Sequence, residues 1–150
     1  MFLRFSIVLS LSLGIVFACE CSAPSVQVKR EHSDVIFRGT IIALKDSEKA
    51  AGIAEGWGRD TKKIAVFRVI RFWKGQVGKT FEMPAVEETS ACIGFWPPYL
   101  KVGSDLLVYA SGHGGAEYYT SIYGFHMLSK DVDEDFKELG TGVEPKENAK

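Results

Sequence analysis

The sequence contains little of several features that mark common classes of protein. It has 3 cysteines, 5 prolines and 3 histidines in 150 residues, and its formal net charge is −1. A chain without a basic excess lacks the electrostatic footprint of a nucleic-acid-binding protein. The serine elbow, the His-Glu-x-x-His sequence and the phosphate-binding loop of common enzymes are also missing. We therefore predict a protein that is not an enzyme, needs no cofactor and binds no nucleic acid.

The N-terminus carries the longest apolar run. One charged residue, Arg4, precedes the run from Phe5 to Phe17, and Ala18 supplies a small residue before a cleavage point. The run is shorter than the about 20 residues that a membrane-spanning helix needs. A charge, a short apolar run and small residues are the order of a secretory signal. We predict that residues 1–18 are a cleaved signal peptide rather than a membrane anchor, and that the mature protein is secreted or reaches the cell envelope.

The mature chain, from residue 19 onward, has the size of one ordinary domain. Of the 18 basic residues Arg4 is lost with the signal, which leaves 17 against 19 acidic residues and a net charge of −2. The mature chain has three cysteines, Cys19, Cys21 and Cys92. Export favours a disulfide, but an odd number of cysteines leaves one unexplained by disulfides within the chain.

The three histidines are His32, His113 and His126. They show no metal-ligand spacing, and we expect them to be solvated or locally hydrogen-bonded.

Five segments rich in β-branched and aromatic residues predict strands. They span residues 35–44, 64–73, 79–86, 106–111 and 117–122. Gly39 in the first segment predicts a bulge or a tight bend, and apolar residues on both faces of the second are typical of a closed barrel. The residues expected in the core are Phe37, Ile41, Val66, Val69, Val108 and Ala110. The pattern favours a small barrel and leaves a sandwich open.

The remaining segments predict peripheral helices, loops and turns. Helical patterns cover residues 25–33 and 131–139, with Gly140 as a C-cap. Charged and glycine-rich sequence predicts a long loop over residues 45–63 and turns over residues 74–78 and 112–115. Trp96-Pro97-Pro98-Tyr99 predicts an ordered turn that could border a binding surface. We expect a domain over residues 19–140 and a disordered tail over residues 141–150.

Several short motifs follow the signal peptide in a definite order. They are Cys19-Glu20-Cys21, residues 34–40, Phe72-Trp73-Lys74-Gly75, residues 90–95 and residues 102–110. In this order they resemble the tissue inhibitor of metalloproteinases family and its netrin-like module, in a single-domain form. The resemblance covers about residues 19–123 and implies a mainly β fold, a five-stranded OB-like barrel with one or two peripheral helices.

The resemblance also implies a function and a site. In such inhibitors the amino nitrogen and carbonyl oxygen of the N-terminal cysteine, here Cys19, ligate the catalytic zinc of a target metalloendopeptidase. The next side chain, Glu20, points into the specificity pocket of the enzyme, and a disulfide joins Cys19 to Cys92. The residues that the resemblance predicts to bind the protease are Cys19, Glu20, Cys21, Ser22, Ser90, Ala91 and Cys92. The only metal contact implied is that of Cys19 with the zinc of the partner enzyme.

Two features depart from the family pattern. Residues 120–124 contain no cysteine, although the family places the partner of Cys21 in this region. Glu20 is charged, whereas the family favours a small neutral residue. Because burying an unpaired carboxylate costs several kcal/mol, an apolar specificity pocket disfavours Glu20, and a target with a basic pocket could accept it.

The odd number of cysteines leaves two arrangements open. In the first, which we favour, Cys19 pairs with Cys92 and Cys21 is a free thiol. In the second, Val16-Phe17-Ala18-Cys19 is a bacterial lipoprotein signal, Cys19 is acylated and Cys21 pairs with Cys92. Phe17 argues against the second arrangement, because such signals usually carry a small residue there. Acylation would attach the domain to a membrane and leave an interaction module of the cell envelope without inhibitory activity.

Overall fold

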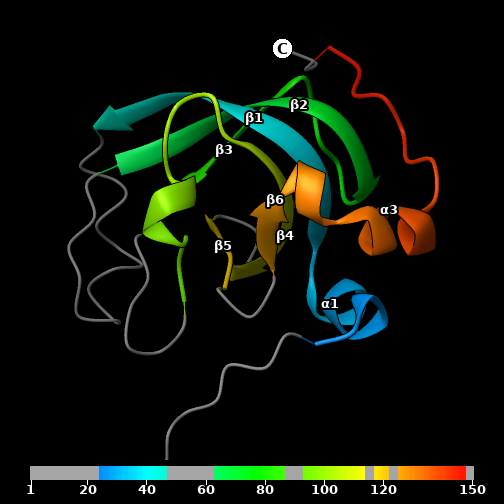
Figure 1. Ribbon diagram of the computed structural model, residues 1–150. Coiled ribbons are helices and arrows are strands. Elements are labelled where there is room, and N and C mark those ends of the chain that lie inside the picture. Colours follow the sequence, from blue (N-terminus) through cyan, green and yellow to red (C-terminus); the bar gives the residue numbers. More distant parts are fainter. Residues whose placement is uncertain (1–23, 47–62, 87–92, 114–116, 122–124, 148–150) are drawn as a thin grey trace, which may run out of the picture.

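The computed structural model describes residues 24–46, 63–86, 93–113, 117–121 and 125–147. The fold is mainly β, with a nearly closed five-stranded barrel and two helices, as the sequence predicted (Figure 1). The elements in chain order are α1 (Val26–His32), β1 (Val35–Asp46), β2 (Lys63–Lys74), β3 (Thr80–Pro84), the 3₁₀ turn η2 (Pro97–Tyr99), β4 (Asp105–His113), β5 (Glu117–Tyr119), β6 (His126–Leu128), the 3₁₀ turn η3 (Ser129–Asp131) and α3 (Asp133–Leu139). Every helix in the described part of the chain is too short and too polar to span a bilayer.

The strands form an antiparallel sheet that curls until its two edges approach each other. Its order is β3-β2-β1-β4-β5, and β6 pairs with β4 beside this path. The edge strands meet through aromatic side chains, since the rings of Phe81 in β3 and Tyr118 in β5 lie 5.1 Å apart. The strands therefore form a barrel and not the sandwich that the sequence pattern left open.

Two apolar clusters lie on opposite faces of β1. Phe37 faces the interior of the barrel, where its ring meets that of Phe67 edge-on at 5.2 Å between the ring centres. Ile36, the preceding residue, belongs to an outer cluster with Leu107 and Tyr109 that Phe136 of α3 covers. All the residues predicted for the core are buried, namely Phe37, Ile41, Val66, Val69, Val108 and Ala110. The outer cluster explains why the strands carry apolar side chains on both of their faces.

The bulge predicted at Gly39 is present. The pairing of β1 with β2 shifts register between Arg38 and Gly39. A Cβ atom at Gly39 would lie 3.1 Å from the carbonyl oxygen of Arg68 and 3.3 Å from the ring of Phe37. Glycine therefore lets the two backbones approach closely while Phe37 fills the barrel beneath them.

Several element boundaries differ from the expectation. β1 continues to Asp46 and β2 begins at Lys63, so the strands include both ends of the expected loop, whose middle lies outside the described residues. The turn predicted from Gly112 was wrong for its first two residues, because Gly112 and His113 extend β4 and pair with β5. The strand β6 was not predicted. Helices α1 and α3 occupy the predicted segments, and Gly140 caps α3 with φ 76° and a bond from its N–H to the oxygen of Phe136.

The chain after α3 turns back onto the outer edge of β2. The N–H of Phe72 donates to the oxygen of Val143 at 2.9 Å, and the N–H of Val143 donates to the oxygen of Phe72 at 2.8 Å. Gly142 makes this approach possible: its φ is 68°, and a Cβ atom there would lie 2.8 Å from the indole ring of Trp73. Val143 thus lies beside β2, and Glu147 forms an ion pair with Lys79, just before β3. Residues 148–150 are outside the described part of the chain.

The contact between Gly142 and Trp73 predicts a specific cost of substitution. Gly142→Ala should lower the free energy of unfolding by more than the about 1–2 kcal/mol of left-handed backbone strain, because the new methyl group must also displace the indole. Urea denaturation of the purified domain measures this loss.

Gly103→Ala is the matched control. Gly103 also has a positive φ, 91°, but nothing lies within 4 Å of its expected Cβ position. Its substitution should cost the backbone strain alone. Equal losses for the two variants would show that the tail does not press against Trp73 in solution.

Candidate functional site

The residues predicted to bind a protease fall on two segments outside the described residues: Cys19, Glu20, Cys21, Ser22, Ser90, Ala91 and Cys92. The cysteine pairing and the environment of Glu20 therefore stay predictions. The structure does place the chain that follows each segment, which begins at Pro24 for the first and at Ile93 for the second. The contacts that fix these two starting points to the barrel are therefore described first.

The first starting point is α1, a helix of only 7 residues. So short a helix is unstable alone and depends on tertiary contacts. Ser25 caps its N-terminus, since its Oγ accepts a hydrogen bond from the N–H of Val28 at 3.4 Å. Three side chains donate hydrogen bonds to backbone oxygens of its last turn. Ser33 Oγ donates to the oxygen of Lys29 at 2.7 Å, and Lys74 Nζ donates to the oxygen of Arg30 at 2.9 Å. Ser111 Oγ donates to the oxygen of His32 at 2.5 Å. The helix is thus joined to the ends of β2 and β4.

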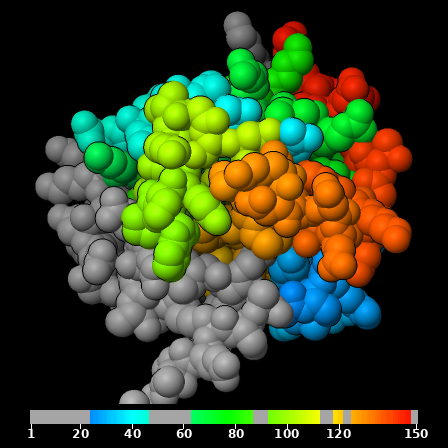
Figure 2. All heavy atoms as spheres, in the orientation of Figure 1, coloured from blue at the N-terminus to red at the C-terminus, as the bar shows by residue number. Residues whose placement is uncertain are grey.

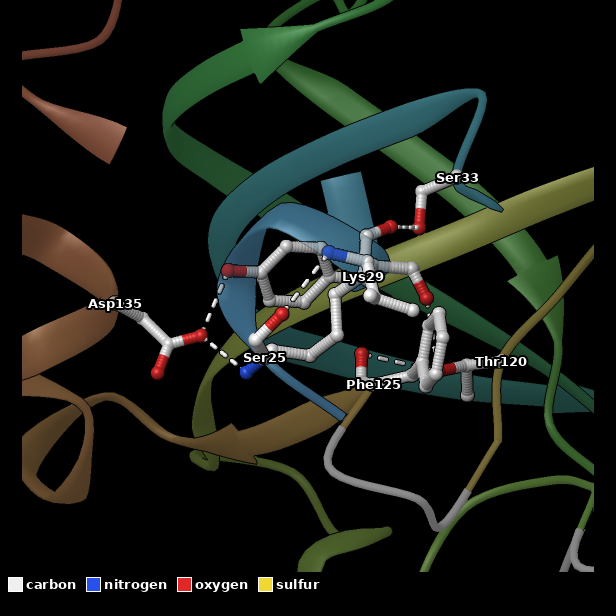
Figure 3. A network of polar contacts seen from close by, with 8 residues as sticks. Ser25, Lys29, Ser33, Thr120, Phe125 and Asp135 are labelled. Carbon is white, nitrogen blue, oxygen red and sulfur yellow. Dashed lines mark hydrogen bonds and ion pairs between the residues drawn. The ribbon is translucent and has the colours of Figure 1, made fainter. Parts of the chain in front are cut away.

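A buried polar cluster, formed by Lys29, Tyr109 and Asp135, joins α1 to β4 and α3 (Figure 3). The ammonium group of Lys29 forms an ion pair with Oδ1 of Asp135. The hydroxyl of Tyr109 donates to the same oxygen at 2.7 Å. Lys29 Nζ also lies 4.8 Å from the centre of the Tyr109 ring, which adds a cation–π contact. Lys29 is 3% exposed, Asp135 8% and Tyr109 0%, so these groups are almost wholly removed from water.

The protonation state of Tyr109 follows from its burial in this cluster. Burial raises the pKa of Tyr109 well above its usual value, and the hydrogen bond to Asp135 raises it further. Tyr109 therefore remains a hydroxyl donor at any physiological pH. A buried charge is tolerated when it is paired and its remaining polar atoms are bonded. Lys29 supplies the opposite charge to Asp135, and Tyr109 supplies a second hydrogen-bond donor.

The second starting point, the chain from Ile93, is fixed to the barrel through Thr120. The N–H of Gly94 donates to the oxygen of Thr120 at 2.9 Å. The Thr120 hydroxyl lies 3.1 Å from the oxygen of Tyr109 and 3.2 Å from that of Phe125 (Figure 3). Ile93 itself forms a β-bridge with Ser121. A continuous path of contacts therefore leads from α1 through Asp135, Tyr109 and Thr120 to Gly94.

His126 fixes the next residues of the same chain. The N–H of Trp96 donates to Nε2 of His126 at 2.7 Å, and Nδ1 of His126 lies 3.1 Å from the oxygen of Ser121. An acceptor role for Nε2 and a donor role for Nδ1 require the neutral imidazole with its proton on Nδ1. Burial lowers the pKa of His126 to about 4. His126 is thus a neutral structural bridge between the segments around Trp96 and Ser121.

The surroundings of two of the three histidines are described. His126 is locally hydrogen-bonded, as expected, and His32 is exposed, whereas the side chain of His113 lies outside the described part. Among the described residues, no three His, Cys, Asp or Glu side chains meet in a way that could hold a metal ion.

The sequence carries a signal for the buried cluster in the helical spacing of its residues. Val26 and Lys29 lie three positions apart in α1, and Ser33, the C-cap residue, follows at the same helical spacing; all three are buried. Val132 and Asp135 share one face of the α3 segment in the same way. A charged residue at helical spacing among buried apolar ones indicates a buried ion pair, but its partner lies 106 positions away and only the fold brings the two together.

The buried His126 predicts a pH dependence of stability. Its pKa is about 4 in the folded chain and about 6.5 when unfolded, so the unfolded state takes up the proton first as the pH falls. The contribution of the neutral His126 to the free energy of unfolding is complete above about pH 6.5. It is lost as the pH falls from about 6.5 to 4, and the total loss is about 3 kcal/mol. Chemical denaturation at several pH values should give a shallower slope for His126→Gln than for the wild type in this window.

His32→Gln is the control, because His32 is exposed. Its substitution should leave the slope unchanged. An NMR titration of the His126 ring in the wild type is an independent measurement, and a pKa close to 6.5 would show that the imidazole is not buried as described.

The Lys29–Asp135 pair predicts an asymmetry between single and double substitutions. Asp135→Leu alone leaves the buried ammonium of Lys29 without a counter-charge, and the free energy of unfolding should fall by about 3–5 kcal/mol. Adding Lys29→Met removes the orphan charge and should recover a large part of that loss. Urea denaturation of the variants in a double-mutant cycle measures the coupling.

The exposed pair of Lys45 and Glu82, 2.8 Å apart, is the comparison. Glu82→Leu should cost less than about 1 kcal/mol, because water solvates Lys45 when its partner is removed. If Asp135→Leu cost as little as Glu82→Leu, Lys29 would not be buried in solution.

Comparison with known proteins adds no family to this description. No protein-family model matches the sequence, and no curated protein matches it at a significant level.

Proposed function

We propose that this chain is a secreted protein of the metalloendopeptidase-inhibitor type. In this proposal the mature protein begins at Cys19, whose α-amino nitrogen and carbonyl oxygen ligate the catalytic zinc of the target enzyme. Residues 19–22 and 90–92 form the contact surface. The mainly β barrel and the order of the motifs after the signal peptide support the proposal.

The observation that carries the proposal is the path of contacts between the bases of the two segments. An inhibitor that inserts a chain terminus must hold that terminus in place, because a free terminus is mobile and loses entropy on binding. Here α1, which follows the first segment, is tied to Asp135 and Tyr109, and Gly94, which follows the second, is tied to Thr120. Since Thr120 contacts Tyr109, both bases share one buried support.

The chemistry of an N-terminal amine suits a catalytic zinc. Such a zinc keeps one coordination position open for water or substrate. An α-amino group has a pKa of about 7.7–8, so a useful fraction is neutral near neutral pH, and only the neutral form is a ligand. A lysine amine, with a pKa of about 10.4, would be almost fully protonated under the same conditions.

A disulfide between Cys19 and Cys92 would join the two segments directly. It would close a loop of about 73 residues, and the chain-entropy model assigns such a loop roughly 4 to 4.5 kcal/mol of stabilisation. Together with the buried support, this bond would hold the amine of Cys19 in one position before the enzyme binds.

Glu20 defines the enzymes that the proposal favours. Its side chain would enter the specificity pocket beside the zinc. A carboxylate buried there without a partner costs several kcal/mol, whereas an arginine or lysine at the bottom of the pocket would pair with it. Zinc endopeptidases with a basic specificity pocket are therefore the first targets to test.

A second function is favoured by the odd number of cysteines. If Cys19 is acylated, Cys21 and Cys92 can pair and no cysteine is left over. The protein would then be a membrane-anchored interaction module of the cell envelope with no inhibitory activity, because acylation removes the free amine.

The proposal predicts that inhibition depends on the free amine of Cys19. The mature protein starting at Cys19 should inhibit at least one zinc endopeptidase in a panel that includes enzymes with basic pockets. A variant with one alanine added before Cys19 should inhibit at least 100-fold more weakly, since the amine is then part of a peptide bond. Inhibition constants from a fluorogenic peptide assay measure the difference.

An alanine added after Lys150 is the control, and it should leave the inhibition constant unchanged. If the protein inhibits an enzyme equally well with and without the N-terminal alanine, zinc ligation by Cys19 is wrong. If it inhibits none of the enzymes, the interaction-module alternative gains support.

A further inference from the structure

Two arginines lie directly opposite each other on the outer face of the barrel. Arg38 of β1 and Arg71 of β2 are partners in the register of these antiparallel strands. The guanidinium carbon of Arg38 lies 5.7 Å from the centre of the Phe136 ring, which covers the outer apolar cluster. Cβ atoms of directly opposed residues are about 4.5–5.5 Å apart, and like charges at such positions destabilise a sheet. The two cations therefore favour a negative group beside them.

Of the two arginines, only Arg38 has a carboxylate at hydrogen-bond distance in the described part of the chain. Its Nη2 donates to Oδ2 of Asp105 at 2.7 Å, and its Nε donates to Oδ1 at 3.1 Å. Arg71 instead donates from Nη1 to the backbone oxygen of Thr141 at 2.7 Å. Oε1 of Glu144 is 3.8 Å from its Nη2, and the Glu144 side chain is 81% exposed. Two positive charges thus face one closely held negative charge.

A hollow of about 180 Å³ lies between the two arginines and the end of α3. Its walls are formed by Arg38, Arg71, Trp73, Phe136, Gly140 and Thr141. The rings of Trp73 and Phe136 stack, with 5.6 Å between their centres and an angle of 26° between their planes. In Figure 2, green atoms of the β2–β3 region and orange to red atoms of α3 and the segment after it adjoin at the surface. The hollow therefore combines a flat apolar wall with two guanidinium groups.

The hollow offers hydrogen-bond donors rather than acceptors. The backbone oxygen of Gly140 already accepts from Trp73 Nε1 at 2.9 Å, and that of Thr141 accepts from Arg71. A guanidinium group carries five N–H groups. The contacts above use two of those on Arg38 and one of those on Arg71. The remaining donors and the unbalanced positive charge both favour an anion.

We propose that this hollow binds a small monocarboxylate. The carboxylate lies between Arg38 and Arg71, whose forked N–H groups match its geometry, and the apolar body packs against the two stacked rings. One negative charge balances the one positive charge that Asp105 leaves over, whereas a phosphate group carries about −1.5 to −2 near neutral pH. The volume corresponds to about six water molecules, which limits the ligand to roughly ten heavy atoms. This site needs none of the residues proposed to contact a protease, so it is independent of the inhibitor function.

Titration of the ¹⁵N-labelled protein with sodium benzoate, acetate or phosphate, followed by NMR at constant ionic strength, tests the site. Benzoate should shift the indole N–H resonance of Trp73 and leave that of Trp96 unchanged, because Trp96 is not part of the hollow. Acetate, which lacks the apolar body, should bind at least threefold more weakly than benzoate, and phosphate at least tenfold more weakly. An unshifted Trp73 resonance with benzoate, or phosphate binding as tight as that of benzoate, would overturn the proposal.

Substitutions of Arg71 test the role of the guanidinium group. Arg71→Gln should weaken benzoate binding at least tenfold, and Arg71→Lys, which keeps the charge but loses the fork, should weaken it by less. Arg68→Gln is the matched control and should change the dissociation constant less than twofold, because Arg68 is exposed on the same strand and does not line the hollow. Thermal unfolding checks that each variant is folded, and Arg71→Lys carries the comparison if Arg71→Gln is not. Unchanged binding by a folded Arg71 variant shows that this group does not hold the ligand.

Two end-blocked peptides distinguish the possible sources of the carboxylate. One carries a single glutamate beside a phenylalanine, and the other carries glutamine in place of the glutamate. Tighter binding of the glutamate peptide than of benzoate assigns the site to an acidic side chain of a partner protein, and the reverse order assigns it to a free small acid. Measurable and equal binding of the two peptides contradicts recognition of a carboxylate.

Discussion

The placement of the two helices on the barrel depends on one buried ion pair between Lys29 and Asp135. These residues come from helices at opposite ends of the described chain, and Tyr109 of β4 lies between them with a hydrogen bond to the carboxylate. Neither charge can leave its partner without being stranded away from water. The pair therefore fixes the positions of α1 and α3 on the barrel more strictly than apolar packing alone would.

That constraint extends to the segments that we propose as the contact surface. Tyr109 accepts a hydrogen bond from Thr120, and Thr120 accepts one from Gly94, so a change in the position of β4 would move both α1 and the chain after Ile93. A polar path suits this role, because hydrogen bonds fix direction as well as distance. Apolar side chains of similar volume would fill the space but would permit sliding. The buried polar groups therefore fix the positions of α1 and of the chain from Ile93, which follow the two segments that we propose as the contact surface.

The fold followed from local features of the sequence, whereas the support of the site did not. Alternating apolar residues, Gly39 and Gly140 predicted the barrel strands, the bulge and the helix cap, since each depends on nearby residues. The pairing of Lys29 with Asp135 and of Phe72 with Val143 joins positions far apart in the chain, and no local pattern encodes such a choice of partner. The burial of His126 also depends on the fold, because nothing in the neighbouring sequence distinguishes it from an exposed histidine. The contact residues were inferred from resemblance alone, and they lie outside the described part of the chain.

The most direct test of the central claim is the mass of the N-terminal peptide of the natively exported protein. Our account predicts cleavage after Ala18 and an unmodified amine on Cys19, with a disulfide from Cys19 to the peptide that contains Cys92. Mass spectrometry of a non-reduced digest would show this cross-linked pair. A diacylglycerol-sized addition on Cys19, or a Cys21–Cys92 cross-link, would contradict it, because the terminus would then be unable to ligate a zinc ion in the proposed geometry.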